Sequence, residues 1–356
     1  MSSGLSKFLG RPVGAELVGR CLSALSASSG RRVAVALGAA LALSATLPAV
    51  AATQIKIAFL APPGSKWDQI FQKMATDVNA KTNNKVRVRF IGGGVMGDEP
   101  DEVRKMRNGQ LQGAALTGMG LGLIEKEIRV LEVPLLYKSD SDVDRATNKL
   151  EPRLTRKLED AGYVLLGWAE VGPVYLFTNK PIRTMADMQG VKMWMWEGDK
   201  LAEAVFKELK LIPTPLAITG VLTALQTGMI DGVYNAPQGL LALQWNGKVK
   251  YMLDLRITQS IGALIMTKKA WDKLDPDVQK VLKEAGSTYS REIVEEGRKD
   301  NSRALAALKK QGVQVTAISA GELAKVKSAA SKVADHLVGE LYSSDALREV
   351  RAGVGQ

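Results

Sequence analysis

A strand followed directly by a helix is predicted by the stretch GVKMWMWEGDKLAEAVFKEL, residues 190–209. Alternation along the strand places Lys192, Trp194 and Trp196 on one face and the valine and methionines on the other. Burying one aromatic side chain is worth roughly 2–3 kcal/mol, so two adjacent indoles are not left in water without a reason. The pair predicts either core packing or a stacking surface for an apolar or aromatic ligand.

The same order of strand and helix continues on both sides of this stretch. Residues 277 to about 311 are predicted to form one long helix, because few residues in them break a helix. An alternation of strands and helices argues for parallel-type sheets covered by helices, and so for an α/β fold. The other predicted elements are strands at Gln54–Leu60, Lys85–Ile91, Ala114–Thr117, Tyr163–Glu170, Val174–Thr178, Gly262–Thr267 and Val313–Ala317, and helices at Lys66–Lys81, Pro100–Asn108, Asp142–Ala161, Val221–Thr227 and Glu322–Tyr342.

The amino terminus has the three parts of a secretory signal. Arg31-Arg32 precedes an Ala-rich apolar stretch, which ends in the small-x-small sequence Ala49-Val50-Ala51. We expect residues 1–51 to be a signal peptide that is cleaved near Ala51, and the mature protein to be periplasmic. Cys21 is the only cysteine of the chain, so the mature protein would have no disulfide and no thiol chemistry.

Length and charge set broad limits on the function. The 356 residues predict about two domains, and the formal net charge is +11. Such a charge fits an anionic partner, a membrane surface or simply a solvated basic surface. No arginine-rich run or nucleic-acid motif is present, and export argues against a nucleic-acid partner.

The residues that would support catalysis are missing from the sequence. His336 is the only histidine, which argues against a zinc site, and there is no Gly-x-Ser-x-Gly motif. Residues 92–97 match G-x-G-x-x-G, but the next predicted strand ends without the acidic residue that a dinucleotide site needs. These glycines instead predict a turn. We expect no catalytic residue, no cofactor and no metal.

Seven segments in a fixed order resemble one family. Together they cover the chain from Gln54 to about Val338, and the strongest is Pro213–Gly232, with a proline-led turn, a short helix and an Asp-Gly corner. The chain resembles the periplasmic solute-binding subunits of tripartite ATP-independent periplasmic (TRAP) transporters, the DctP-like family. The other six segments are Ile55–Ala58, Lys81–Val88, Gly97–Gly109, Val130–Leu136, Thr178–Ile182 and Met185–Met193.

This resemblance implies a two-lobed periplasmic binding protein fold with mixed sheets, hinge strands and a long bracing helix. Residues 52–174 and about 263–356 would form lobe I with the hinge and the C-terminal helices, and residues 175–262 would form lobe II. The implied function is to bind a small solute and deliver it to the small and large membrane subunits of a secondary transporter. No catalysis is implied.

The chain departs from the family at the ligand. The family usually holds an organic acid with an arginine, whose position is Trp194 here, and many relatives carry a second arginine at the position of Val174. The family's asparagine is retained as Asn235. The two apolar replacements predict an apolar, aromatic or weakly charged ligand.

Further candidate ligand contacts are Trp196 and Glu197 beside Trp194, Trp67 after the first strand, and Tyr234 and Gln238, which flank Asn235. Two alternatives stay open. The same fold could still bind a carboxylate through Lys192, Arg183 or a bound cation, and the protein could be a periplasmic enzyme.

Overall fold

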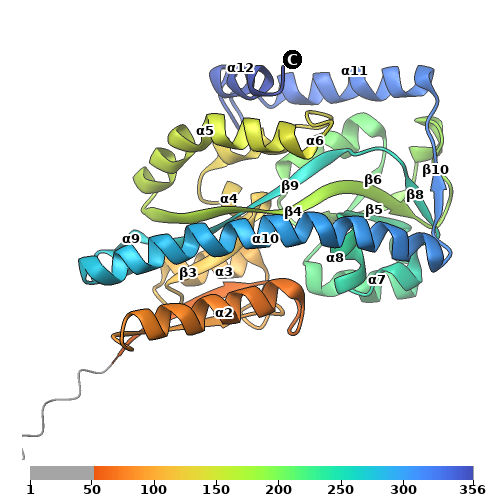
Figure 1. Ribbon diagram of the computed structural model, residues 1–356. Helices are drawn as coiled ribbons and strands as arrows, with labels where there is room; N and C mark the ends of the chain where they lie inside the picture. Colours follow the sequence, from red (N-terminus) through yellow and green to blue (C-terminus); the bar gives the residue numbers. More distant parts are fainter. Residues whose placement is uncertain (1–51, 356) are drawn as a thin grey trace, which may run out of the picture. The chain divides into compact units, whose positions relative to one another are not determined.

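The computed structural model describes residues 52–355. They form one compact unit in which two α/β lobes share a strand (Figure 1). The predicted signal peptide and Cys21 lie outside the described residues. The sheet of the first lobe has the order β2-β1-β3-β9-β4, and that of the second continues as β4-β7-β5-β6. The strands are β1 (Thr53–Phe59), β2 (Val86–Ile91), β3 (Gly113–Thr117), β4 (Tyr163–Thr178), β5 (Lys192–Trp196), β6 (Ile212–Leu216), β7 (Gly232–Asn235), β8 (Tyr251–Leu253), β9 (Thr258–Thr267) and β10 (Gln314–Thr316).

Both sheets are mixed. In the first, β1 pairs in parallel with β2 and β3, and β9 pairs antiparallel with β3 and β4. In the second, β5 pairs in parallel with β6 and β7, whereas β4 is antiparallel to β7 and β8. The prediction of mixed sheets is confirmed. The simpler expectation of parallel-type sheets is wrong, because β9 returns to the first lobe against the direction of its neighbours.

One continuous strand, β4, joins the two sheets. The sequence predicted two strands separated at Gly172-Pro173, but the pairing with β9 continues through both residues after a register shift at Glu170/Gly172. Gly172 has φ +130°, and a Cβ there would lie 2.2 Å from Asn301 Nδ2. This residue must therefore be glycine, and it produces a bulge in the strand rather than an end.

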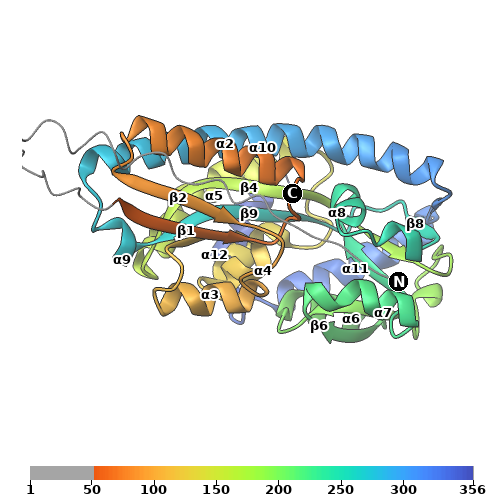
Figure 2. The ribbon, with the colours of Figure 1, turned by 90° about the horizontal axis from the view of Figure 1, so that it is seen from below.

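Helices cover both faces of the first sheet (Figure 2). On one face α2 (Lys66–Lys81) and α10 (Pro276–Lys310) bury one apolar cluster. The other face buries a second cluster. Its elements are α3 (Glu99–Arg107), α4 (Gly118–Gly122), the 3-10 helix η1 (Lys126–Glu132), α5 (Asp140–Asp160) and α12 (Ser344–Gly353). Short α9 (Lys268–Trp271), after β9, packs against the first cluster.

The sheet of the second lobe also has a core on each face. Trp194 and Trp196 belong to one apolar cluster, and Met193 and Met195 belong to the other, as strand alternation predicted. The helices here are α6 (Lys200–Leu209), α7 (Val221–Thr227) and α8 (Pro237–Ala242), and α11 (Ala320–His336) packs against α6. Short 3-10 helices are η2 (Ala186–Met188), η3 (Ile218–Gly220) and η4 (Asn246–Lys248).

The long helix α10 braces both lobes, as the family resemblance implied. It runs for 35 residues along β4 and packs on α2 of the first lobe and on α8 of the second (Figure 1). Between residues 52 and 355, no helix combines the length and the apolar character needed to cross a membrane.

Two buried carboxyl groups lie together on α3. Glu102 is fully buried, and neither of its carboxyl oxygens has a hydrogen-bond partner. Burial raises the pKa of Glu102 to about 9, with repulsion from Glu99 and Asp98 adding to the shift. Burial also raises the pKa of Glu99 to about 7, although Thr117 and Gly120 donate hydrogen bonds to it. Both groups therefore retain a proton to higher pH in the folded protein than in the unfolded chain.

The free energy of unfolding should fall as the pH rises from about 4.5 to 9, because the folded protein retains a proton on Glu102 that the unfolded chain releases. Between pH 5 and pH 8 this contribution reaches about 4 kcal/mol. Glu102→Gln removes this pH-dependent contribution. Urea unfolding at several pH values should therefore show that the free energy of unfolding of the variant rises relative to that of the wild type as the pH rises. Asp101→Asn, at a partly exposed position of the same helix, is the matched control. Parallel pH profiles for wild type and Glu102→Gln would contradict this.

Candidate functional site

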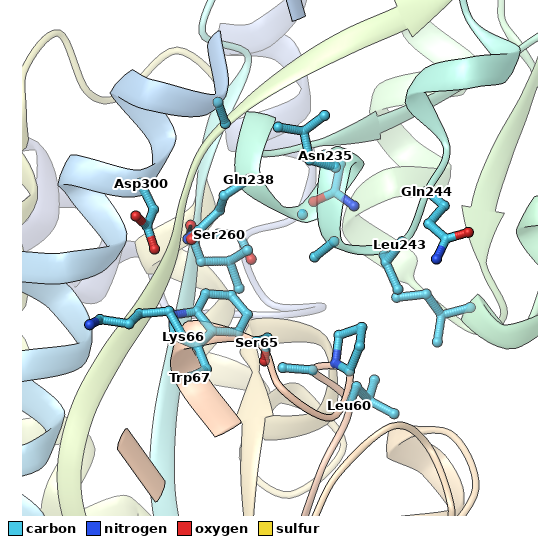
Figure 3. Close-up of a pocket in the computed structure, with 18 of the residues that line it drawn as sticks. Leu60, Ser65, Lys66, Trp67, Asn235, Gln238, Leu243, Gln244, Ser260 and Asp300 are labelled. Carbon is cyan, nitrogen blue, oxygen red and sulfur yellow. Dashed lines mark hydrogen bonds between the residues drawn. The ribbon is translucent and has the colours of Figure 1, made fainter. Parts of the chain in front are cut away.

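A cavity of about 660 Å³ is lined by residues of both lobes. The first lobe contributes Leu60 and Ser65 of the β1–α2 loop and Trp67 at the start of α2, and the second contributes the ends of β5 and β7 together with α8 (Figure 3). Asp300, Arg303 and two alanines of α10 complete the wall. A concave, mostly apolar enclosure of this size suits a small organic molecule.

Seven of the eight residues predicted from the sequence line this cavity. They are Trp67, Val174, Trp194, Trp196, Tyr234, Asn235 and Gln238. Glu197 does not line it, because the chain turns after Trp196 and leaves this carboxylate exposed. The sequence reasoning missed Ile218, Leu241 and Leu243, which lie on η3 and at or just after α8, elements too short to give a periodic pattern.

Stacked aromatic rings form the wall of the second lobe. Trp194 is 2% exposed and stacks on Tyr234 at 4.9 Å with an interplanar angle of 16°. Trp245 meets it edge-on at 5.2 Å, and Trp196 lies 5.6 Å away. The indole N–H of Trp194 donates to the carbonyl of Leu216 at 3.0 Å. Trp194 is thus both cavity wall and core, and its replacement by alanine would cost about 3–5 kcal/mol of stability as well as any ligand contact.

Trp67 forms part of the wall of the first lobe, next to α10. Its indole N–H is buried without a hydrogen-bond partner. A Cβ at Gly297 on α10 would lie 3.8 Å from this nitrogen. Gln238 is anchored beside it, because its side-chain amide donates to the carbonyl of Val171 at 2.7 Å and its backbone N–H donates to Asn301. These contacts fix the orientation of Gln238 without involving Trp67.

Asn235 ends β7 at the cavity. Its Oδ1 accepts a hydrogen bond from the backbone N–H of Ala236 at 2.8 Å, which directs the chain into α8. A Cβ at Gly239 would lie 2.4 Å from the same oxygen, so α8 can approach this side chain only with glycine there. The side chain of Asn235 therefore has a structural role as well as a place in the wall.

The charged residues that line the cavity are already paired. Arg303 lies 3.4 Å from Asp300 and 3.9 Å from Glu296, and Lys66 lies 4.0 Å from Glu296. The side chains of both cations are largely exposed, at 67% and 44%. Lys192 and Arg183, considered from the sequence as carboxylate anchors, do not line the cavity. Among its lining residues no buried cation is available to an anionic ligand.

A buried ion cluster lies behind the aromatic wall. Trp196, Tyr234 and Val174 also line a smaller cavity of about 90 Å³, whose other side holds Arg129, Glu132 and Asp199. Arg129 donates to Asp199 at 2.8 Å and pairs with Glu132. Burial alone would lower the pKa of Arg129, but Asp199 and Glu132 raise it, so this guanidinium is charged and fully engaged.

The carboxylates of this cluster outnumber its cation by two to one. Burial raises the pKa of Glu132 against the attraction of Arg129. It also raises the pKa of Tyr234 well above its ordinary value, with Asp199 adding to the shift. The cluster therefore offers no unpaired positive charge to the wall. Within residues 52–355 no group of three or more histidine, cysteine, aspartate and glutamate side chains is arranged to hold a metal ion.

Two α/β lobes that share a long strand and enclose one cavity are the architecture of a bilobed ligand-binding protein. The chain belongs to the bacterial extracellular solute-binding protein family 7, the DctP family, whose model matches residues 57–340. It is 26% identical over 335 residues to the C4-dicarboxylate-binding periplasmic protein DctP of Rhodobacter capsulatus, covering 92% of this chain and 99% of that one. A solute-binding protein of Chromohalobacter salexigens is 25% identical over 65% of this chain and 69% of its own.

Solved structures share the fold. The sugar acid binding protein DctPAm of Advenella mimigardefordensis, in complex with galactonate, matches with a TM-score of 0.80 and 20% identity, over 86% of this chain and 99% of its own. A TRAP periplasmic solute-binding protein of Desulfovibrio salexigens with bound orotic acid matches with a TM-score of 0.79 and 19% identity, over 85% of this chain and 98% of its own. The chain is therefore a solute receptor of the TRAP transporter type, a periplasmic class of protein.

Filling the cavity should weaken ligand binding without unfolding the protein. Ala242 on α8 lines the cavity and is itself exposed, so Ala242→Trp places an indole in the ligand space without disturbing the core. Affinity for any bound solute should fall at least about tenfold, or 1.4 kcal/mol, in calorimetric titration. Ala306→Trp, on an exposed position of α10 outside the lining, is the control. Unchanged affinity in Ala242→Trp would place the ligand elsewhere.

Proposed function

We propose that this receptor binds a neutral solute with an apolar or aromatic body in the 660 Å³ cavity and delivers it to the small and large membrane subunits of a TRAP transporter. The observation that supports this most directly is that two apolar side chains, Val174 and Trp194, line the cavity where the family resemblance places the arginines that hold a carboxylate. We also propose that the chain acts as a receptor and not as an enzyme.

The physical argument is desolvation. A carboxylate that enters an enclosed cavity loses its hydration and needs a cation or several N–H donors in exchange. Here the nearest buried cation, Arg129, is engaged by two carboxylates behind the wall, and the cations at the cavity edge are paired. A neutral solute avoids this penalty and gains from apolar area and contact with the aromatic rings.

The lobes that would close on the solute are residues 52–174 with about 263–356, and residues 175–262. β4 and β9, which connect these parts, would act as the hinge. Cleavage of the signal peptide near Ala51 would deliver the mature chain to the periplasm. Amino-terminal sequencing of the exported protein tests this, and a mature protein that still contains Arg31 would contradict it.

Ligand charge can be tested with matched probe pairs, such as indole-3-acetamide against indole-3-acetate and benzamide against benzoate. We expect the neutral member of a pair to bind at least about tenfold more tightly, and succinate to bind with a dissociation constant of about 1 mM or weaker. Calorimetric titration at constant pH measures both. Micromolar binding of succinate, or a preference for the anionic member, would instead support a carboxylate receptor that uses other groups or a bound cation.

Trp67 should contribute to the affinity for an aromatic probe. Its side chain is half-buried, so Trp67→Leu removes ring area from the cavity while it retains an apolar residue on α2. Binding of the preferred neutral probe should weaken by roughly 1–3 kcal/mol through lost area and ring contact. Trp271→Leu, at a tryptophan outside the cavity lining, is the control. If Trp67→Leu and the wild type bound the probe with equal affinity, Trp67 would not be a ligand contact.

A further inference from the structure

A smaller cavity of about 80 Å³, which we call the inner chamber, adjoins the ligand cavity. The two share part of their lining, namely Leu60, Ala61, Trp67, Thr117 and Val171. The residues that line the inner chamber lie on the strands of the first sheet or directly after them, and on α2, α3 and α10. The inner chamber is therefore built from the first lobe, and its walls do not depend on how the lobes close.

Small side chains leave this space within the core of the first lobe. Ala115 on β3 and Ala169 on β4 line the inner chamber and belong to strands in the interior of the sheet. Both pack against the apolar cluster beneath α2 and α10, yet both remain partly accessible. A space of this size holds several water molecules or a short tail of a ligand.

Two polar groups of the lining have no hydrogen-bond partner within residues 52–355. They are the indole N–H of Trp67 and the hydroxyl of Ser290, and both atoms are buried. Ser290 is only 3% exposed. A buried polar group that stays unpaired costs about as much as a hydrogen bond contributes. Each of these groups therefore favours a ligand that brings an oxygen atom to it.

The other polar side chains of the lining are already engaged. Both carboxyl oxygens of Glu99 accept hydrogen bonds from Thr117. Those of Glu170 accept from Gln259 and Arg298. Among the residues that line the inner chamber there is no cation, so an anionic group would meet two carboxyl groups and no positive charge. The inner chamber thus suits an uncharged group.

The order of residues along α10 shows how the two spaces are connected. Ser290 and Ile293 line the inner chamber, and Asp300 lines the ligand cavity. Gly297 lies between them, and a Cβ there would be 3.8 Å from Trp67 Nε1. The ring of Trp67 lies beside α10 (Figure 3). Its N–H is therefore at the junction of the two spaces, and Ser290 lies deeper.

We propose that the inner chamber is a second compartment of the ligand site, which receives an uncharged, oxygen-bearing tail of the solute while the apolar or aromatic body lies in the ligand cavity. Trp67 Nε1 donates to a carbonyl, ether or hydroxyl oxygen of the tail at the junction. The hydroxyl of Ser290 bonds a second oxygen deeper in. The inference rests on the proposed function and narrows its ligand class to elongated neutral solutes.

The hydrogen bond is tested with 4-phenyl-2-butanone and with 2-methyl-4-phenyl-1-butene, in which a methylene group replaces the carbonyl oxygen. The protein, which contains six tryptophans, is labelled with ¹⁵N-tryptophan. The indole N–H signal of Trp67, assigned from the spectrum of Trp67→Phe, should move downfield with the ketone and much less with the hydrocarbon. Trp271, which lines neither space, provides the reference signal.

Affinities give a second readout of the same bond. Trp67→Phe retains an aromatic ring and removes the N–H. The ratio of the affinity for the ketone to that for the hydrocarbon should fall about fivefold in this variant, which corresponds to one hydrogen bond. Lost ring area affects both probes and cancels in the ratio. Trp271→Phe is the control and should leave the ratio unchanged.

Filling the inner chamber tests whether the tail enters it. Ala115 lines this space and not the ligand cavity, so Ala115→Leu should weaken binding of the ketone at least about tenfold in calorimetric titration. Benzamide is too short to extend past the ligand cavity, and its affinity should stay the same. Ala169→Val fills the space with fewer atoms and should act in the same direction, and thermal unfolding checks that both variants are folded.

The inference is overturned if the ketone fails to bind or shifts the Trp67 signal no more than the hydrocarbon does. It is also overturned if the ketone binds Ala115→Leu and Ala169→Val as tightly as the wild type, because the inner chamber would then hold only water. A preference for benzoate over benzamide, together with a shift specific to the ketone, would disprove the proposed ligand class and retain the inner chamber as a binding site.

Discussion

Antiparallel pairing of β4 with β9 is the constraint on which the rest of the molecule depends. Ten residue pairs, from Tyr163 with Thr267 to Val174 with Thr258, form one ribbon, and β4 then continues into the second sheet. Both lobes are therefore built on the same backbone, and the cavity lies where the ribbon passes from one to the other. The bulge at Gly172 increases the local twist without ending the strand. Side chains from both lobes thus meet around one space.

The aromatic wall is the feature on which the proposed ligand class rests. A guanidinium in the wall would offer two directed N–H donors, whereas Trp194 and Val174 offer area and ring faces. Arg129 lies behind this wall and is paired with Asp199 and Glu132. That cluster satisfies its own charges, because an unpaired buried charge would strongly destabilise the fold. The receptor therefore retains a buried ion pair in its interior but presents no free cation to the cavity.

The features that local pattern determines were predictable from the sequence. Strand alternation predicts that Trp194 and Met195 lie on opposite faces of the sheet. An uninterrupted helical stretch predicts the long helix α10. Short β6 was missed because Pro213 and Pro215 conceal the alternation. Continuous β4 was missed because pairing with β9, a long-range interaction, overrides a local break. The contacts of Asp98 with the second lobe were not predicted because its partners there lie 98 and 120 residues away, and no local pattern encodes such a contact.

Two helix-capping aspartates each accept hydrogen bonds from the opposite lobe. Asp98 caps α3 and accepts from the second lobe, while Asp199 caps α6 and accepts from Arg129 of the first. Within a closed protein each carboxylate is dehydrated and must find donors, and in an open one water would supply them. The net stabilisation is therefore modest, but a shifted closure would leave a buried carboxylate without donors. These contacts therefore specify one closed geometry but contribute little to its free energy. A receptor that must release its solute benefits from a closed state that is well defined but only weakly stabilised.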